Sequence, residues 1–423
     1  MAHTAEFPAT RDRIAEVPIR ELAETFGTPT YVYDLSVVGK RIDDLAAFDV
    51  IRYAQKANSN LAVLDYARRR GVRVDAVSAG EIARALAAGY RPGRQPTEIV
   101  YTADIFDRAS LEAVVKYDLL CNLGSPDMIE QYGQAAPGRG IVLRINPGFG
   151  HGHSQKTNTG GPQSKHGIWH EQLPECVALA KRYDLRIVGL HMHIGSGTDF
   201  EHLAQVCGAM ERIAVDYGIE VRSISAGGGL PIPYRVGQAT IDLERYHAVW
   251  AETRDRLARR FGHPVELEIE PGRYLVAESG YLITEIRAVK RMGDNLFYLV
   301  DAGFNNLARP ILYGAYHPIS ICPADGRAST DLVEAIVGGP LCESGDIFTQ
   351  EEGGFVSRRS LPAAKVGDLL ILERAGAYGA VMGSNYNSKP LAAEVTIDGG
   401  RPFLARRRQT LDEIMQGEAI PGR

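Results

Sequence analysis

A chain of 423 residues is too long for one ordinary hydrophobic core, so its length predicts two domains. Hydrophobic residues make up 45% and charged residues 23% of the chain, and the net charge is -5. This balance is typical of a globular protein and argues against a nucleic-acid-binding or membrane-spanning protein. Residues 1–27 lack the apolar core of a secretory signal, and the five scattered cysteines form no CxxC pair, so we expect a cytoplasmic enzyme.

Strand-like runs alternate with helical patterns from residue 50 to residue 273. The eight runs span 50–56, 72–78, 98–103, 119–124, 141–148, 186–195, 222–229 and 265–273. Amphipathic stretches such as LAVLDYARRRG and HLAQVCGAMERIAVDYG lie between them. Eight parallel strands with helical crossovers predict a closed (β/α)8 barrel of the TIM type. An open doubly wound sheet is the alternative, but its GxGxxG motif after the first strand is absent.

The pattern changes after about residue 275. Stretches such as YLVAESGYLITEIRAVKRM and VGDLLILERAGAYG are rich in strand formers and are separated by Gly and Pro turns, which indicates a separate β domain. TPTYVYD precedes the first barrel strand, so the N-terminal segment is expected to join that β domain. We therefore predict an α/β fold with an N-terminal segment at 1–30, a barrel domain at 31–274 and a β domain at 275–423.

Function in (β/α)8 barrels collects at the C-terminal ends of the strands. The polar or glycine residues at those ends are Lys56, Asp75, Ser78, Asn146, His191, His193, Gly227–Gly229, Glu270 and Arg273. Each of them alone has an ordinary explanation, because end-of-strand lysines often reach only to water and glycine runs often form only turns. Together they predict a pocket.

This pocket combines the features that pyridoxal phosphate (PLP) requires. SAGGGLP offers unobstructed backbone N–H groups for a phosphate, and Ser196 can add a hydroxyl. Lys56 supplies an amine for a Schiff base, Glu270 a carboxylate for the pyridine nitrogen, and His193 a flat ring. A metal site is the alternative because HMH places two imidazoles on one strand face, but the other strand ends offer Gly, Lys and Arg, so no metal is expected.

A second polar cluster lies in the β domain. In GGPLCESGDIF, Cys342 and Glu343 are either a buried thiol beside a surface acid or a proton donor beside a cation binder. Further anchors for a charged amino-acid substrate are Arg273, Arg309, Tyr313 and Tyr378.

In order along the chain, these motifs resemble the diaminopimelate decarboxylases, which are PLP enzymes of fold type III. The resemblance rests on YAQKANSN, HMHIGSG, SAGGGL, EPGRYLVAESG, GPLCESGD and GAYGAVMGSNYNSKP, and it covers about residues 30–410. GFGHGHSQKTNTGG and SKHGIW further resemble the proteobacterial branch of that family. The resemblance implies a PLP-binding barrel, a C-terminal β-barrel and a homodimer with active sites at its interface.

The resemblance also implies roles for individual residues. Lys56 matches the PLP lysine, His193 the residue stacked on the ring and Glu270 the partner of the pyridine nitrogen. The residues assigned to the cofactor are completed by Asp75, Ser196, Gly228, Gly272, Arg273 and Tyr378. The residues assigned to the substrate are Arg273, Arg309, Tyr313, Glu343 and Tyr378. Cys342 matches a proton donor that is supplied across the dimer.

The implied reaction is decarboxylation of meso-2,6-diaminopimelate to L-lysine and CO₂, the last step of lysine biosynthesis. The alternatives are a sister decarboxylase of the carboxynorspermidine or ornithine type, a racemase, and a non-catalytic PLP-binding homologue. Lys56 and Cys342 together argue against the last, since a binding protein needs no proton donor. Gly383 and Lys389 depart from the MSSNYNSRP that relatives often carry.

The loop 151–167 is long and rich in glycine, and it follows the fifth strand. We expect either a lid that orders over bound substrate or a mobile surface loop.

Overall fold

The computed structural model describes residues 6–150, 160–193, 199–329 and 331–422. The chain separates into two compact units. One consists of Met1–Val38, Ile232–Thr240 and Val276–Arg423, and the other, the barrel unit, consists of Gly39–Pro231 and Ile241–Leu275. Sequence patterns placed residues 31–38 and 232–240 in the barrel domain, whereas here they lie in the first unit. No helix of the described residues is long and apolar enough to cross a membrane.

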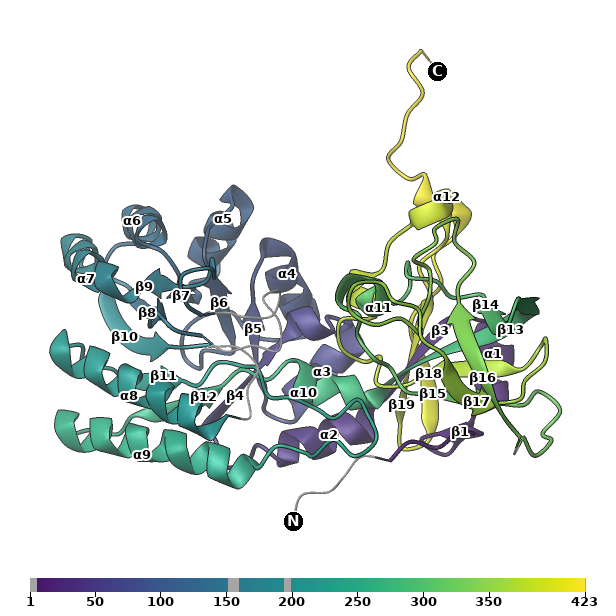
Figure 1. The fold of residues 1–423 in the computed structure, drawn as a ribbon. Helices are drawn as coiled ribbons and strands as arrows, with labels where there is room; N and C mark the ends of the chain where they lie inside the picture. Colours follow the sequence, from purple (N-terminus) through teal and green to yellow (C-terminus); the bar gives the residue numbers. More distant parts are fainter. Residues whose placement is uncertain (1–5, 151–159, 194–198, 330, 423) are drawn as a thin grey trace. The chain divides into compact units, whose positions relative to one another are not determined.

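The predicted (β/α)8 barrel is confirmed in the described part of the barrel unit (Figure 1). Its parallel strands are β4 (Val50–Ala54), β5 (Arg73–Ala76), β6 (Ile99–Ala103), β7 (Leu120–Leu123), β8 (Gly140–Asn146), β10 (Arg186–His191), β11 (Ser223–Ser225) and β12 (Glu266–Ile269). The ring closes because β12 pairs with β4 and β10 pairs with both β8 and β11. The short β9 (Ile168–Trp169) adds to β8 outside the ring.

Helices cover the outside of these strands (Figure 1). They are α3 (Leu61–Arg69), α4 (Ala79–Ala87), α5 (Arg108–Lys116), α6 (Pro126–Ala135), α7 (Leu173–Arg182), α8 (Phe200–Asp216) and α9 (Leu243–Phe261), with α2 (Leu35–Asp43) before the barrel and α10 (Arg273–Val276) after it. Six of them begin at a side-chain N-cap, which satisfies backbone N–H groups that would otherwise lack a partner. The caps are Asn60, Ser78, Asp107, Ser125, Asp199 and Asp242. Ser78, a strand-end candidate in the sequence, thus begins α4, and its hydroxyl accepts from the Glu81 N–H at 3.1 Å.

The first unit contains a mainly antiparallel sheet of order β17-β16-β14-β13-β3-β19-β20, with β18 between β13 and β15. Its strands are β3 (Thr30–Asp34), β13 (Gly280–Met292), β14 (Asn295–Val300), β15 (Ile319–Cys322), β16 (Leu332–Gly338), β17 (Arg359–Pro362), β18 (Leu369–Leu372), β19 (Ala393–Asp398) and β20 (Arg401–Arg406). The short helices of this unit are α1 (Ile19–Phe26), α11 (Arg309–Tyr313) and α12 (Leu411–Ile414). Because β3 pairs with both β13 and β19, the N-terminal segment supplies an internal strand of the sheet.

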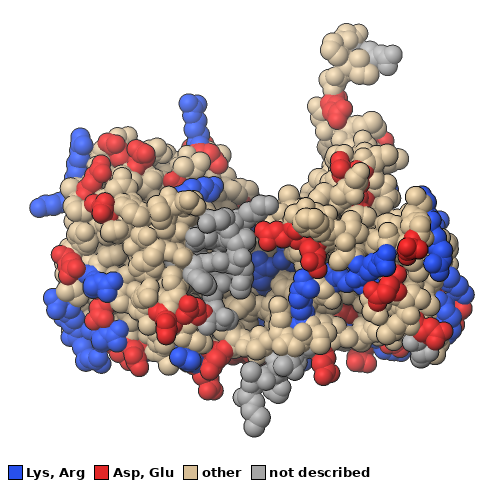
Figure 2. Space-filling model, viewed as in Figure 1, with Lys and Arg blue, Asp and Glu red and all other residues tan. Residues whose placement is uncertain are grey.

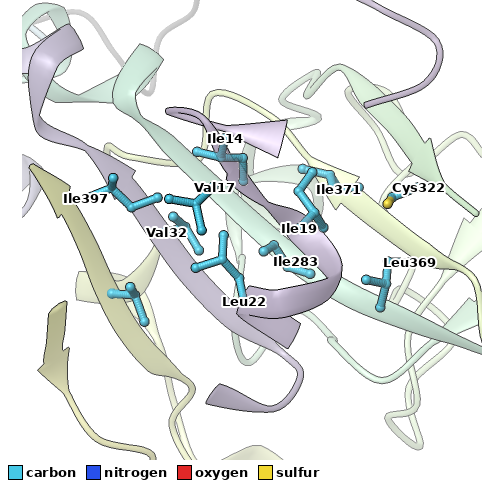
Figure 3. Packing of buried hydrophobic residues seen from close by; sticks show 11 residues of the cluster. Ile14, Val17, Ile19, Leu22, Val32, Ile283, Cys322, Leu369, Ile371 and Ile397 are labelled. Carbon is cyan, nitrogen blue, oxygen red and sulfur yellow. The ribbon is translucent and has the colours of Figure 1, made fainter. Parts of the chain in front are cut away.

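The N-terminal hairpin β1 (Arg13–Ile14) and β2 (Val17–Pro18) and helix α1 pack on one face of this sheet (Figure 3). The packed residues are Ile14, Val17, Ile19, Leu22, Val32, Ile283, Cys322, Leu369, Ile371, Val395 and Ile397. Burial of each such aliphatic side chain contributes about 1.5–3 kcal/mol to the free energy of folding. Residues far apart in the sequence thus form one core.

Charged side chains of both signs are interspersed on the face seen in Figure 2.

Candidate active site

Glu270 follows β12 directly and is nearly buried, with 6% of its surface exposed. Its Oε2 lies 2.7 Å from Nε2 of His191, the last residue of β10, and its Oε1 accepts a hydrogen bond from the Ser225 hydroxyl at 3.2 Å. Burial raises the pKa of Glu270, but His191, His193 and Arg144 outweigh burial and lower that pKa to about 2. Glu270 is therefore a carboxylate that the ends of three strands hold in its ionised form.

His193, two residues beyond β10, lies beside the glycine loop after β11. The Gly228 N–H donates to His193 Nδ1 at 2.7 Å, which leaves the ring proton on Nε2 in the neutral imidazole. Burial and the positive charges of Arg144 and Lys56 hold the pKa of His193 well below its usual range. The site thus presents an uncharged flat ring close to an anionic carboxylate.

The glycine loop leaves no room for side chains. A Cβ atom at Gly228 would lie 2.5 Å from the carbonyl oxygen of Glu270. Gly227 has a φ of 63°, in the left-handed region, and a Cβ atom there would meet the Met192 carbonyl oxygen at 2.7 Å. The loop therefore brings bare backbone next to Glu270 and His193.

Lys56 lies in a short 3-10 turn, η1 (Gln55–Ala57), just beyond the end of β4, and its side chain is exposed. Asp75 on β5 is buried, and burial together with the negative charge of Glu270 raises its pKa well above its usual range. Asp75 Oδ1 and His191 Nδ1 are buried and have no hydrogen-bond partner among the described residues. The barrel end thus contains two carboxylates with opposite pKa shifts and buried polar atoms that a bound molecule can satisfy.

These observations test whether PLP fits. Its aldehyde requires an amine, its pyridine nitrogen a carboxylate and its phosphate an unobstructed stretch of backbone. Lys56, Glu270 and the glycine loop supply all three at one end of the barrel unit, and the residues present fit the cofactor. Gly272, also predicted for the cofactor, packs its backbone on the end of β4, where an added Cβ would lie 3.2 Å from the Ala54 carbonyl oxygen. Arg273 is the first residue of α10 and is half-buried.

Sequence reasoning missed Arg144, Ser225 and the role of His191. Arg144 is buried on β8, and its charge acts on both Glu270 and His193. The available signal was an arginine inside the apolar strand IVLRIN. That signal is ambiguous, because Arg52 in VIRYA instead forms a buried ion pair with Glu268, with Nε to Oε2 at 2.7 Å.

Ser196 and residues 151–159 of the predicted lid lie outside the described residues. The C-terminal end of that loop is fixed to the barrel at two points. The side chain of Asn146 donates from Nδ2 to the Gly161 carbonyl oxygen at 3.1 Å and accepts at Oδ1 from the Gly161 N–H at 3.0 Å. His166 Nδ1 lies 2.6 Å from Asp104 Oδ2. The lid itself stays a prediction.

The remaining predicted residues lie in the first unit. Arg309 begins α11 and is buried, with 7% of its surface exposed, whereas Tyr313 at the end of the same helix is exposed. Cys342 and Glu343 are exposed in the loop after β16. Tyr378 is half-buried and has a φ of 55°. The predicted residues thus form two groups, one at the C-terminal end of the barrel strands and one in the first unit.

The loop that carries Cys342 is held by specific hydrogen bonds. The Cys342 N–H donates to Asn387 Oδ1 at 2.9 Å, and the buried carboxylate of Asp346 accepts from the Leu341 N–H at 2.8 Å. Asn387 has a left-handed backbone, with a φ of 54° and a ψ of 27°, which asparagine tolerates better than most residues.

The sequence and the fold match known decarboxylases. A family model described as "Pyridoxal-dependent decarboxylase, pyridoxal binding domain" matches residues 39–277. The chain is 54% identical to the diaminopimelate decarboxylase of Escherichia coli over 98% of this chain and 99% of the relative. It is 53% identical to that of Streptomyces coelicolor over 99% of this chain and 96% of the relative.

Solved structures agree with these relatives. A crystal structure of diaminopimelate decarboxylase superposes with a TM-score of 0.94 at 53% identity, covering 97% of this chain and 98% of that one. The Helicobacter pylori diaminopimelate decarboxylase complexed with L-lysine superposes with a TM-score of 0.83 at 30% identity, covering 94% of this chain and 98% of that one.

Proposed function

Because this chain belongs to the diaminopimelate decarboxylase family of pyridoxal-dependent decarboxylases, we propose that it removes CO₂ from meso-2,6-diaminopimelate to give L-lysine, the last step of lysine biosynthesis. One observation carries the proposal beyond family membership. At the barrel end the anionic Glu270 contacts His191 and Ser225, and the neutral His193 accepts from the backbone of the bare glycine loop. The five unpaired cysteines favour a cytoplasmic location.

Bound PLP supplies an electron sink for the pair of electrons that CO₂ leaves behind. Lys56 would hold the cofactor through its side-chain amine. Glu270 remains ionised and so keeps a proton on the pyridine nitrogen, which maintains the electron demand of the ring. His193 is neutral and presents a ring face that does not repel this cationic system.

The proton that replaces CO₂ needs a donor. Cys342 is the proposed donor, and its thiol is exposed at the tip of a loop whose backbone Asn387 holds. An exposed donor is suited to act on a site that another copy of the chain contains. We therefore propose a homodimer in which Cys342 and Glu343 complete the partner's site.

Substrate choice depends on the end of the molecule that does not react. Arg273, Arg309 and Tyr313 are proposed to bind its carboxylate, and Glu343 its ammonium group. A buried arginine left without its carboxylate partner carries a large desolvation cost, so substrates that lack a distal carboxylate bind poorly.

The direct test incubates the purified, PLP-loaded protein with meso-diaminopimelate, L,L-diaminopimelate, ornithine and lysine, and measures CO₂ and amine products. We expect turnover of the meso isomer, little of the L,L isomer and essentially none of the other two. Lys56→Ala is the inactive control. Comparable rates on ornithine or on the L,L isomer would contradict the proposed specificity, and interconversion of the diaminopimelate isomers without CO₂ release would indicate a racemase.

A further inference from the structure

The guanidinium of Arg309 is held by a histidine that the proposed reaction does not use. Arg309 Nη1 lies 2.8 Å from Nε2 of His317, which precedes β15 and has 1% of its surface exposed. The Tyr234 ring covers both groups. The Arg309 guanidinium carbon is 4.9 Å from the Tyr234 centroid, and the Tyr234 and His317 rings meet edge to face with centroids 5.6 Å apart. All three residues belong to the same unit.

The hydrogen bonds of His317 determine its protonation state. Its Nδ1 lies 2.9 Å from the backbone carbonyl oxygen of Glu373, which can only accept, so Nδ1 carries a proton. A guanidinium can only donate, so Nε2 must offer a lone pair to Arg309. His317 is therefore neutral and has its single ring proton on Nδ1. A second proton on Nε2 would place two cations in contact in a buried position.

The charged groups around His317 do not favour its cation. Arg309 faces it from α11, and Tyr234 faces it from the segment 232–240. The Glu373 carboxylate lies in the same region but already receives Arg11, with Nε to Oε1 at 2.9 Å, and the Ser320 hydroxyl at 2.8 Å.

The adjacent Tyr316 ring stacks with two more cations. The guanidinium carbons of Arg359 and Arg235 lie 3.6 Å and 4.4 Å from its centroid. Protonation of His317 therefore adds positive charge where arginines already predominate, so it works against the Arg309 contact.

We propose that His317 is a positioning residue whose neutral Nε2 fixes the Arg309 guanidinium for the distal carboxylate of the substrate. This inference rests on the proposed function, because it takes Arg309 as the carboxylate anchor. It adds a residue that sets substrate affinity through Arg309 without touching the substrate.

The test measures L-lysine binding to the PLP-loaded protein by titration calorimetry, because the proposed product keeps the distal carboxylate and needs no catalysis to bind. The variants are His317→Leu, which removes the acceptor, and His317→Gln, whose amide oxygen can accept from Arg309 but does not titrate. Arg309→Ala reports the anchor itself. Circular dichroism and the melting temperature report folding of each variant.

At about pH 8 we expect His317→Leu to weaken L-lysine binding about tenfold, the usual effect of losing a hydrogen bond to a charged group, and His317→Gln to stay within about threefold of the wild type. The ratio of wild-type to His317→Gln affinity should stay within about threefold, because the glutamine amide oxygen can replace the imidazole lone pair. In steady-state assays His317→Leu should raise KM for meso-diaminopimelate more than it lowers kcat.

A purely structural His317 would lower the melting temperature and leave these binding profiles unchanged, which would overturn the proposal. Equal loss of binding in His317→Leu and His317→Gln would also overturn it, because only the glutamine keeps an acceptor for Arg309. If Arg309→Ala binds L-lysine normally, the anchor assignment fails and this inference fails with it, whereas CO₂ release from meso-diaminopimelate tests the reaction separately.

Discussion

Replacing Glu270 with glutamine removes the charge from the barrel end with little change in shape. The surrounding His191, His193 and Arg144 lower the Glu270 pKa from 4.5 to about 2 in spite of its burial. At about 1.4 kcal/mol for each pKa step, this pocket favours the carboxylate over its neutral form by roughly 3 kcal/mol. A neutral side chain cannot keep the pyridine nitrogen protonated, so we expect kcat to fall about 100-fold, the lower end of the range for losing one group that controls a proton in the reaction.

The assay compares kcat on meso-diaminopimelate for the wild type, Glu270→Gln and Glu266→Gln, together with the absorbance spectrum of the bound cofactor. Glu266 begins the same strand but is exposed, so its variant controls for a Glu-to-Gln change on β12. We expect Glu270→Gln to lose about 100-fold and to show an altered spectrum, and Glu266→Gln to do neither.

Stability provides a second measurement on the cofactor-free protein. The folded-state pKa of Glu270 is lowered, so its contribution is fully present above about pH 4.5 and is lost as pH falls toward 2. Glu270→Gln should therefore be less stable than the wild type at neutral pH, and the difference should shrink in acid. The reasoning is refuted if Glu270→Gln keeps more than half of wild-type kcat, or if its stability deficit is the same at pH 7 and near pH 3.

Three further predictions concern the cofactor and the proton donor. Lys56→Ala should lose the PLP adduct that borohydride reduction fixes, as detected by mass spectrometry. Mixing Lys56→Ala with Cys342→Ala should recover partial activity, and no recovery would mean that each site is built within one chain. Gly228→Ala should weaken PLP binding at least about tenfold in equilibrium dialysis, because its Cβ has no room, whereas Gly80→Ala in a helix should not. Asn387→Ala should lower kcat about fivefold and change the alkylation rate of the Cys342 thiol, because it removes the acceptor of the Cys342 N–H. Asn387→Asp keeps that acceptor and is the control. Equal behaviour of the two variants would show that the hydrogen bond is irrelevant.

The barrel and its site were predictable because the relevant information is local and periodic. Alternating strands and helices define the (β/α)8 barrel, and that topology brings the strand ends carrying Glu270, His193 and Gly228 to one edge. Lys56 was expected at the end of a strand and lies in a turn just beyond it, a boundary error that leaves it near the same edge.

Contacts between distant segments were not predictable in the same way. Tyr234 lies in the stretch PIPYRVGQAT, which has no helical or strand period, and only the folded chain shows that it packs on Arg309 and His317. Arg144 was missed because an arginine in an apolar strand can serve either a site or an ion pair. Sequence alone offers no means of separating it from Arg52.

The position of β3 has a consequence for biosynthesis. Thr30 pairs with Ala393 on β19, about 360 residues later, so at ordinary translation rates the ribosome makes one strand roughly 20 to 70 seconds before the other. All strands of the barrel ring are made before the C-terminus, whereas β3 has no partner until β13 is made and keeps an open edge until β19 is made. Its residues Tyr31, Val32 and Tyr33 are fully buried only in the finished sheet. Nascent chains therefore carry an apolar, unpaired strand near their N-terminus for most of synthesis, and truncations that remove β19 leave that strand permanently at a sheet edge.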